Sequence, residues 1–242
     1  MQLRVDMAEA QMRAWSQIAC PGTWWSGAER VAIAAETRNA GKCRLCADRR
    51  NALSSTTDPG AHDGLGILPS PVIDAIHRIY KASGRLGSGW FSRLLASGLS
   101  DAHYVELVSI VAVFVAVDTF QYAAGLDRWD LPEPRNGAPT RRRLSGAKPG
   151  LGWVATIAPE DRDASDPDLY GDEPGPRRRT GANIHRALSL VPDAMLHWWD
   201  MFEPMYQTSA QMRDFSQEPR AVTHAQMEML AARVAALNRC EY

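Results

Sequence analysis

The stretch VELVSIVAVFVAV, residues 105–117, is the most apolar run in the chain, and it decides the expected fold class. Its 13 residues, which include Glu106, are fewer than the roughly 20 apolar residues with which a helix crosses a membrane. We therefore predict a buried helix, which Ser100 can cap at its N-terminal end. Because Glu106 falls on an apolar face of this helix, we interpret it as a buried, paired carboxylate without a chemical role.

Capping residues and apolar spacing predict further helices on both sides of this stretch. Strand signals are few, and GLGWVATI (150–157) is the best of them. We therefore predict an all-α fold, a bundle of short apolar helices packed on one another. The expected helix starts are the capping boxes Ser26–Glu29 and Thr223–Gln226, Ser70-Pro71 and Pro192, and the last helix carries the stripe Met227, Leu230, Val234 and Leu237.

The segment 126–180 differs in composition from the rest of the chain, with many proline, glycine, arginine and aspartate residues. It separates an N-terminal helical half, 1–125, from a C-terminal half, 181–242. A segment of this length is either a linker or a partly ordered cover, and its charge favours a solvated connector. The two halves could be related copies, because eleven residues separate Asp118 from Glu106, just as eleven separate Cys240 from Glu228.

The overall composition limits the class of protein. The chain has 242 residues, of which 45% are hydrophobic and 23% charged, and a net charge of -1. This balance is typical of a soluble globular protein and gives no reason to expect nucleic acid or a membrane as partner. The first residues, MQLRVDMAEAQ, lack the pattern of a signal peptide, so we expect a cytoplasmic location.

Four cysteines in a chain of this length do not indicate a disulfide scaffold, but Cys43-Arg-Leu-Cys46 is a Cys-x-x-Cys pair. It could be a redox thiol pair, whose pKa values the neighbouring arginines would lower. It could instead be half of a zinc or iron site, with His62 and His77 as the other ligands. A purely structural role is the third interpretation, and the sequence does not choose among them.

The last residues, EMLAARVAALNRCEY from Glu228 onward, have a specific spacing. The spacing of Glu228 and Cys240, with eleven residues between them, resembles the signature of the alkylhydroperoxidase (carboxymuconolactone decarboxylase-like) family. That signature is Glu, eleven residues, Cys-x-x-Cys, three residues and His. The stretches WWSGAERVAIAAETRNAGKCRLCADRR (24–50), GLSDAHYVELV (98–108) and RALSLVPDAM (186–195) are similar to a longer, two-part subgroup of that family.

The resemblance implies a peroxide-reducing protein of the thiol or selenol redox class, with a hydroperoxide substrate, a thiol electron donor, no cofactor and a homo-oligomeric state. Cys240 would carry out the redox step and Glu228 would serve a proton relay. The family pattern places its second cysteine at position 243 and its histidine four positions later, beyond Tyr242. We therefore expect selenocysteine at position 243, and we expect the 242-residue chain to be inactive as a peroxidase. The rival hypothesis is a non-catalytic metal-binding or scaffold protein built on Cys43, Cys46, His62 and His77.

Overall fold

The computed structural model describes residues 3–52, 60–150, 152–171, 181–208, 210–238 and 240. These residues form α-helices joined by loops and short 3-10 turns, with no extended strand among them, so the predicted all-α fold is confirmed. The α-helices are α1 (Val5–Ile18), α2 (Gly27–Ala40), α3 (Arg44–Asn51), α4 (Ser70–Ala82), α5 (Ser88–Ala96), α6 (Asp101–Ala123), α7 (Asn183–Arg186), α8 (Pro192–Met205) and α9 (His224–Leu237).

The predicted helix starts are present where the capping residues place them. Ser26 and Glu29 form a complete capping box at α2, and Thr223 and Gln226 form another at α9. In each box the hydroxyl oxygen accepts from a backbone N–H and the longer side chain accepts in return, which satisfies two donors at the helix end. Ser100 caps α6 by accepting from the backbone N–H of His103.

Helix α6 is the centre of the fold and contains the apolar run at 105–117. At 23 residues it is long and apolar enough to cross a membrane by length and composition alone. Half of its most apolar 18-residue window is buried inside the protein, and the core helix of a globular protein passes the same test. Its side chains Leu107, Ile110 and Phe114 are nearly inaccessible to solvent and pack against the surrounding helices.

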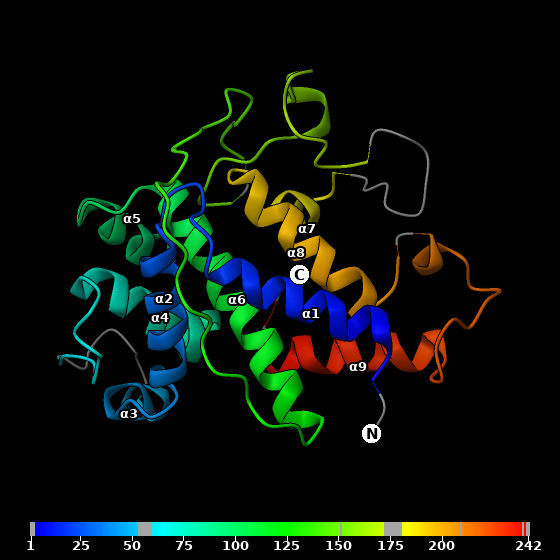
Figure 1. Cartoon of the computed structure of the whole chain (residues 1–242), viewed down its shortest axis with the longest axis horizontal. Coiled ribbons are helices and arrows are strands. Elements are labelled where there is room, and N and C mark those ends of the chain that lie inside the picture. The colour runs from blue at the N-terminus through cyan, green and yellow to red at the C-terminus, as the bar shows by residue number, and fades with distance from the viewer. Residues whose placement is uncertain are drawn as a thin grey trace.

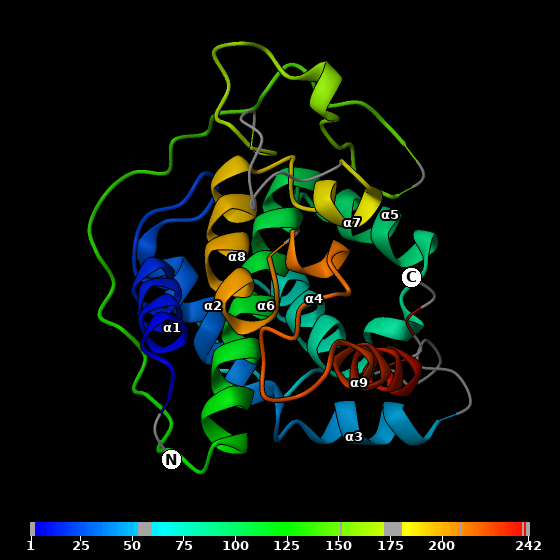
Figure 2. The same cartoon turned by 90° about the vertical axis from the view of Figure 1, so that its right-hand side faces the viewer.

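The hydrophobic core crosses the division between the two predicted halves. Helix α1 lies along α8, while α2 packs against α4 and α6 (Figures 1 and 2). One hydrophobic cluster joins Trp15 of α1 and Phe114 of α6 to Met201 of α8. The side chains of Arg13 and Asp200 pair across the same α1–α8 contact, with Nε 2.9 Å from Oδ2. Residues 1–125 and 181–205 therefore share a core.

The described part of 126–180 is a cover on the helices and not a solvated connector. The backbone N–H of Arg135 donates to the carbonyl of Ala19 at 2.8 Å, and that of Arg141 donates to Thr23 at 2.8 Å. Figure 1 shows this extended strap running over the ends of α1 and α2. Further along the segment, Leu144, Ile157, Leu169 and Tyr170 are buried.

Two other features of the sequence fall in this segment. The best strand signal, at 150–157, corresponds in the residues described there to one isolated antiparallel bridge between Lys148 and Thr156. A single bridge is not a β-strand pair, because the residues on either side of it do not continue the backbone hydrogen bonding. The arginines at 177–179 lie outside the described residues.

Glu106 is buried and paired, as expected. Its carboxylate accepts from the Arg30 guanidinium and from the backbone N–H of Trp24, the latter at 2.6 Å. Burial raises the pKa of Glu106, although Arg30 opposes that shift. The pair holds α2, α6 and the loop before α2 together, because breaking it would leave an uncompensated buried charge.

Candidate metal centre

Cys43, Cys46, His62 and His77 come from three parts of the chain that meet beside α2. Cys43 is the residue before α3, and Cys46 lies in its first turn. His62 is in the loop that leads to α4, and His77 is in the middle of α4. One ligand atom from each residue lies within 4.8 Å of all the others. The four residues of the predicted metal-binding alternative are therefore brought together.

The separations match the edges of a tetrahedral coordination shell. Nδ1 of His62 lies 3.6 Å from Sγ of Cys43 and 3.5 Å from Sγ of Cys46, and Nδ1 of His77 lies 3.4 Å from Sγ of Cys46. With Zn–S near 2.3 Å and Zn–N near 2.0 Å, a tetrahedral site separates sulfur from nitrogen by about 3.6 Å. These three sulfur–nitrogen separations are thus close to those of a tetrahedral zinc site, and all four ligand atoms lie within 4.8 Å of one another.

Both histidines turn their other ring nitrogen to a carboxylate. Nε2 of His77 is 2.9 Å from Oε1 of Glu36, and Nε2 of His62 is 3.0 Å from Oδ1 of Asp74. An ionised carboxylate can only accept, so each Nε2 carries the proton and each Nδ1 presents its lone pair to the sulfurs. Carboxylate partners of this kind fix the tautomer and orientation of metal-binding histidines.

The two carboxylates are themselves held in place. Glu36 is fully buried and accepts from the amide of Asn39 at 3.0 Å and from the backbone N–H of Leu65 at 2.9 Å. Asp74 receives Nε of Arg78, one turn further along α4, at 2.8 Å. Burial opposes their ionisation, but these hydrogen bonds and the histidines outweigh it and lower the pKa of both carboxyls.

The two thiols differ in acidity. Burial opposes ionisation of Cys43, but the backbone N–H groups of Cys46 and Asp63 donate towards its sulfur and lower its pKa. Burial and the neighbouring Cys43 sulfur raise the pKa of Cys46 to about 12. Without a cation, Cys43 and Cys46 are therefore not both ionised. A cation bound between them would stabilise the thiolate form of both.

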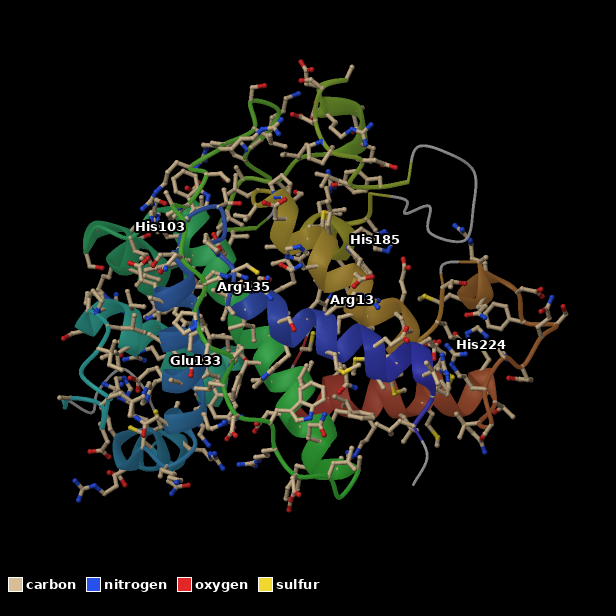
Figure 3. The ribbon with its side chains drawn as sticks, viewed as in Figure 1. Arg13, His103, Glu133, Arg135, His185 and His224 are labelled. Atoms are coloured by element: carbon tan, nitrogen blue, oxygen red, sulfur yellow. The ribbon has the colours of Figure 1, made fainter. Side chains whose placement is uncertain are left out.

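Both sulfurs are shielded from solvent. Cys43 is 3% exposed and Cys46 is 6% exposed. Buried thiols of this kind are poorly accessible to a hydroperoxide, whereas reactive cysteines are partly exposed. Figure 3 shows that three other histidines, His103, His185 and His224, lie far apart on different elements.

The structure places Glu228 and Cys240 at different levels of the α9 region. Tyr206 donates its hydroxyl to Glu228 at 2.5 Å, and the backbone N–H of Cys240 donates to the carbonyl of Ala235. Seven helical residues separate Glu228 from Ala235, an axial rise of about 10 Å. Cys240 is exposed to solvent. The relay expected of Glu228 and Cys240 also needs the second cysteine and the histidine of the family pattern, at positions after Tyr242, so it stays a prediction. Asp118 on α6, the residue that corresponds to Cys240 if the two halves are related copies, pairs with Arg38 and Arg128.

The sequence indicated Cys43, Cys46, His62 and His77 as candidate ligands. It did not indicate the carboxylates of Glu36 and Asp74. Asp74 had a local signal, because it stands three residues before His77 and so lies near it along α4. Glu36 had none, since it reaches His77 only through the packing of α2 on α4.

Comparison of the chain with protein-family models, curated proteins and solved structures finds no match.

Proposed function

We propose that this protein binds one zinc ion through Cys43, Cys46, His62 and His77, and that the ion has a structural role. The observation that carries the proposal is the convergence of two thiol sulfurs and two imidazole Nδ1 atoms within 4.8 Å, with the other nitrogen of each imidazole against a carboxylate. Two sulfurs and two nitrogens in tetrahedral positions are the donor set that zinc takes in structural sites.

The charges around the cluster support a divalent ion. With both thiols ionised, the two sulfurs and the carboxylates of Glu36 and Asp74 carry four negative charges. Arg49 and Arg78 lie beside Asp74 and supply two positive charges. A divalent cation brings this group to neutrality, which is what burial in a low-dielectric interior favours.

A structural role follows from the number of ligands. Four protein ligands complete a tetrahedral zinc shell and leave no position for water or substrate, whereas catalytic zinc sites keep one open. The ion would tie the start of α3 and the loop at 60–69 to the middle of α4. Helix α3 has Cys46 as its one buried residue, and Arg85 donates to backbone carbonyls at its C-terminal end, so the metal would add an anchor at its N-terminal end.

The test is the metal content of the purified chain, measured by elemental analysis after exhaustive dialysis. We expect one equivalent of zinc in the wild type and loss of that equivalent in Cys46→Ser and His77→Gln. Cobalt substituted at the same site should show the absorption bands of tetrahedral coordination together with thiolate-to-metal charge transfer.

The matched controls are Cys20→Ser and Cys240→Ser, which remove cysteines outside the cluster, and His185→Gln. These three variants should keep the full equivalent of metal. Zinc that persists in both Cys46→Ser and His77→Gln, or that is absent from the wild type under reducing conditions with added zinc, would refute the proposal.

A second candidate is hydroperoxide reduction at Cys240, for which the support is the resemblance at 228–240 and the exposure of this thiol. A solvent-exposed thiol is open to attack on a peroxide, unlike the buried Cys43 and Cys46. In this reaction the Cys240 thiolate would attack one oxygen of the hydroperoxide. The S–O bond forms as the O–O bond breaks, which leaves a sulfenic acid on Cys240 and releases the other oxygen as an alcohol. A second thiol or selenol would then condense with the sulfenic acid, forming an S–S or S–Se bond and releasing water.

The test for this candidate is peroxide consumption by the chain extended at its carboxyl end through the second cysteine and the histidine of the motif. Glu228→Gln and Cys240→Ser in that product should abolish the activity, while Cys43→Ser should not. Full activity in both of the first two variants would exclude Glu228 and Cys240 as the catalytic pair.

A further inference from the structure

A large cavity lies between α8 and α9, away from the cysteine–histidine cluster. Its volume is about 1040 Å³, at the upper end of the range of small-molecule sites. Helix α9 forms one wall and keeps His224 as its only buried residue. The facing wall, on α8 and the residue after it, is aromatic, with Trp199, Phe202 and Tyr206. The wall on α9 includes Met227, Leu230 and Val234.

The aromatic wall is ordered by its own ring contacts. The rings of Trp199 and Phe202 meet edge to face with centroids 5.4 Å apart, and those of Phe202 and Tyr206 are 5.5 Å apart. Opposite them, Leu230 is 57% exposed and Val234 is 56% exposed although both side chains are apolar. The two walls therefore offer an apolar surface that the described residues do not fill.

One polar side chain in the lining is unusual. Gln207 is 2% exposed, and neither its amide nitrogen nor its amide oxygen has a hydrogen-bond partner among the described residues. An amide buried in this way is unfavourable unless something pairs with it. Both amide atoms are inaccessible to solvent in this conformation, so a turn about the side-chain torsions would be needed to present them to the cavity that the side chain lines.

The chemistry of this amide selects the head group of a ligand. Gln207 offers a donor and an acceptor side by side, so a primary carboxamide can pair with both atoms at once. A carboxylate can only accept, so it would leave the amide oxygen of Gln207 facing a negative oxygen. The carboxylates of Glu203 in the lining and Glu228 beside Tyr206 further disfavour an anion.

We infer that this cavity binds a neutral amphiphile, a molecule with one long apolar chain and a primary carboxamide head that pairs with Gln207. The apolar chain lies between the aromatic side chains of α8 and the aliphatic side chains of α9. This site is independent of the zinc site, since none of its lining residues belongs to the cysteine–histidine cluster.

The test is isothermal titration of the zinc-loaded chain with decanamide and with decanoate at neutral pH. We expect saturable binding of decanamide at least about tenfold tighter than that of decanoate, because a site that hydrogen-bonds a head group discriminates against one that cannot reciprocate. Gln207→Leu, which keeps the side-chain volume and removes the amide, should bring the two affinities to within about twofold of each other.

Two further variants complete the test. Gln217→Leu changes an exposed glutamine and should keep the wild-type preference. Ala235→Phe places a ring in the cavity and should abolish binding of both compounds, with thermal melting showing that the variant is folded. Absence of saturable decanamide binding to the wild type, or an unchanged preference in Gln207→Leu, would overturn the inference. Because metal content is measured separately, either result leaves the zinc proposal to its own test.

Discussion

The contact between Glu36 and His77 offers a sharp test of the metal centre. Glu36→Gln keeps the size of the side chain and changes one carboxylate oxygen to an NH₂ group. Oε1 accepts from His77 and Asn39, and Oε2 accepts from the backbone N–H of Leu65. Whichever oxygen becomes NH₂, at least one of the groups that donate to Glu36 in the wild type then faces another donor, in a fully buried site.

The size of the effect follows from these bonds. Loss of one buried hydrogen bond with an unsatisfied partner costs about 1–3 kcal/mol. If the NH₂ group takes the place of Oε1, His77 loses the acceptor that fixes its Nε2–H tautomer. Changes to such carboxylate partners typically lower metal affinity by about 10–100-fold. We therefore expect zinc binding by Glu36→Gln to be weaker by about that factor, with the four ligands still present.

The assay is competition for zinc with a chromophoric chelator of known affinity, under reducing conditions. Glu9→Gln is the matched control, because it makes the same chemical change at an exposed position on α1 and should leave the affinity unchanged. If Glu36→Gln binds zinc within about twofold of the wild type, the carboxylate does not orient His77 for a metal, and that part of the argument is wrong.

Two further predictions concern the scaffold. A Cβ on Gly22 would overlap the Glu106 carboxylate. Gly22→Ala should therefore lower the free energy of unfolding, measured by denaturant titration, by about 1–3 kcal/mol. The control is Gly87→Ala, whose Cβ meets open space and should change that free energy by less than about 0.5 kcal/mol. Arg143 donates to Asp101 and lowers the pKa of that carboxyl. This contribution to stability is present above the unfolded pKa of about 3.9 and is lost as pH falls through the lower folded value. Arg143→Leu should therefore raise the pKa of Asp101 in a carboxyl NMR titration, and an unchanged pKa would contradict this assignment.

The sequence predicted the helices well because their signals are local. The capping boxes at Ser26 and Thr223 act within four residues, and the apolar run on α6 is long enough to be recognised alone. The weak strand signal at 150–157 belongs to a covering segment: Ile157 is buried, and among the described residues Thr156 makes one isolated bridge, with Lys148.

The four residues of the proposed metal site were named together from the sequence, as one of three interpretations, but their convergence could not be derived from it. Cys43 and Cys46 are marked by their spacing, whereas His62 and His77 are two among six histidines and gain meaning only when the loop before α4 folds back on α3. The stripe expected on α9 was correct in spacing, but Leu230, Val234 and Leu237 are exposed and not packed in a core. Periodicity identifies an apolar face and does not say what covers it.

The pairing of α1 with α8 has a consequence for the synthesis of the protein. The first helix ends at Ile18, and its main partner is complete only at Met205, 187 residues later. At translation rates of about 5–20 residues per second, roughly 10 to 40 s pass between the two events. During that interval Trp15, Ile18 and Phe114 lack the side chain of Met201 that completes their cluster. The nascent chain must therefore present an unfinished apolar surface to the cell, and the growing polypeptide is expected to need chaperone protection until α8 has emerged.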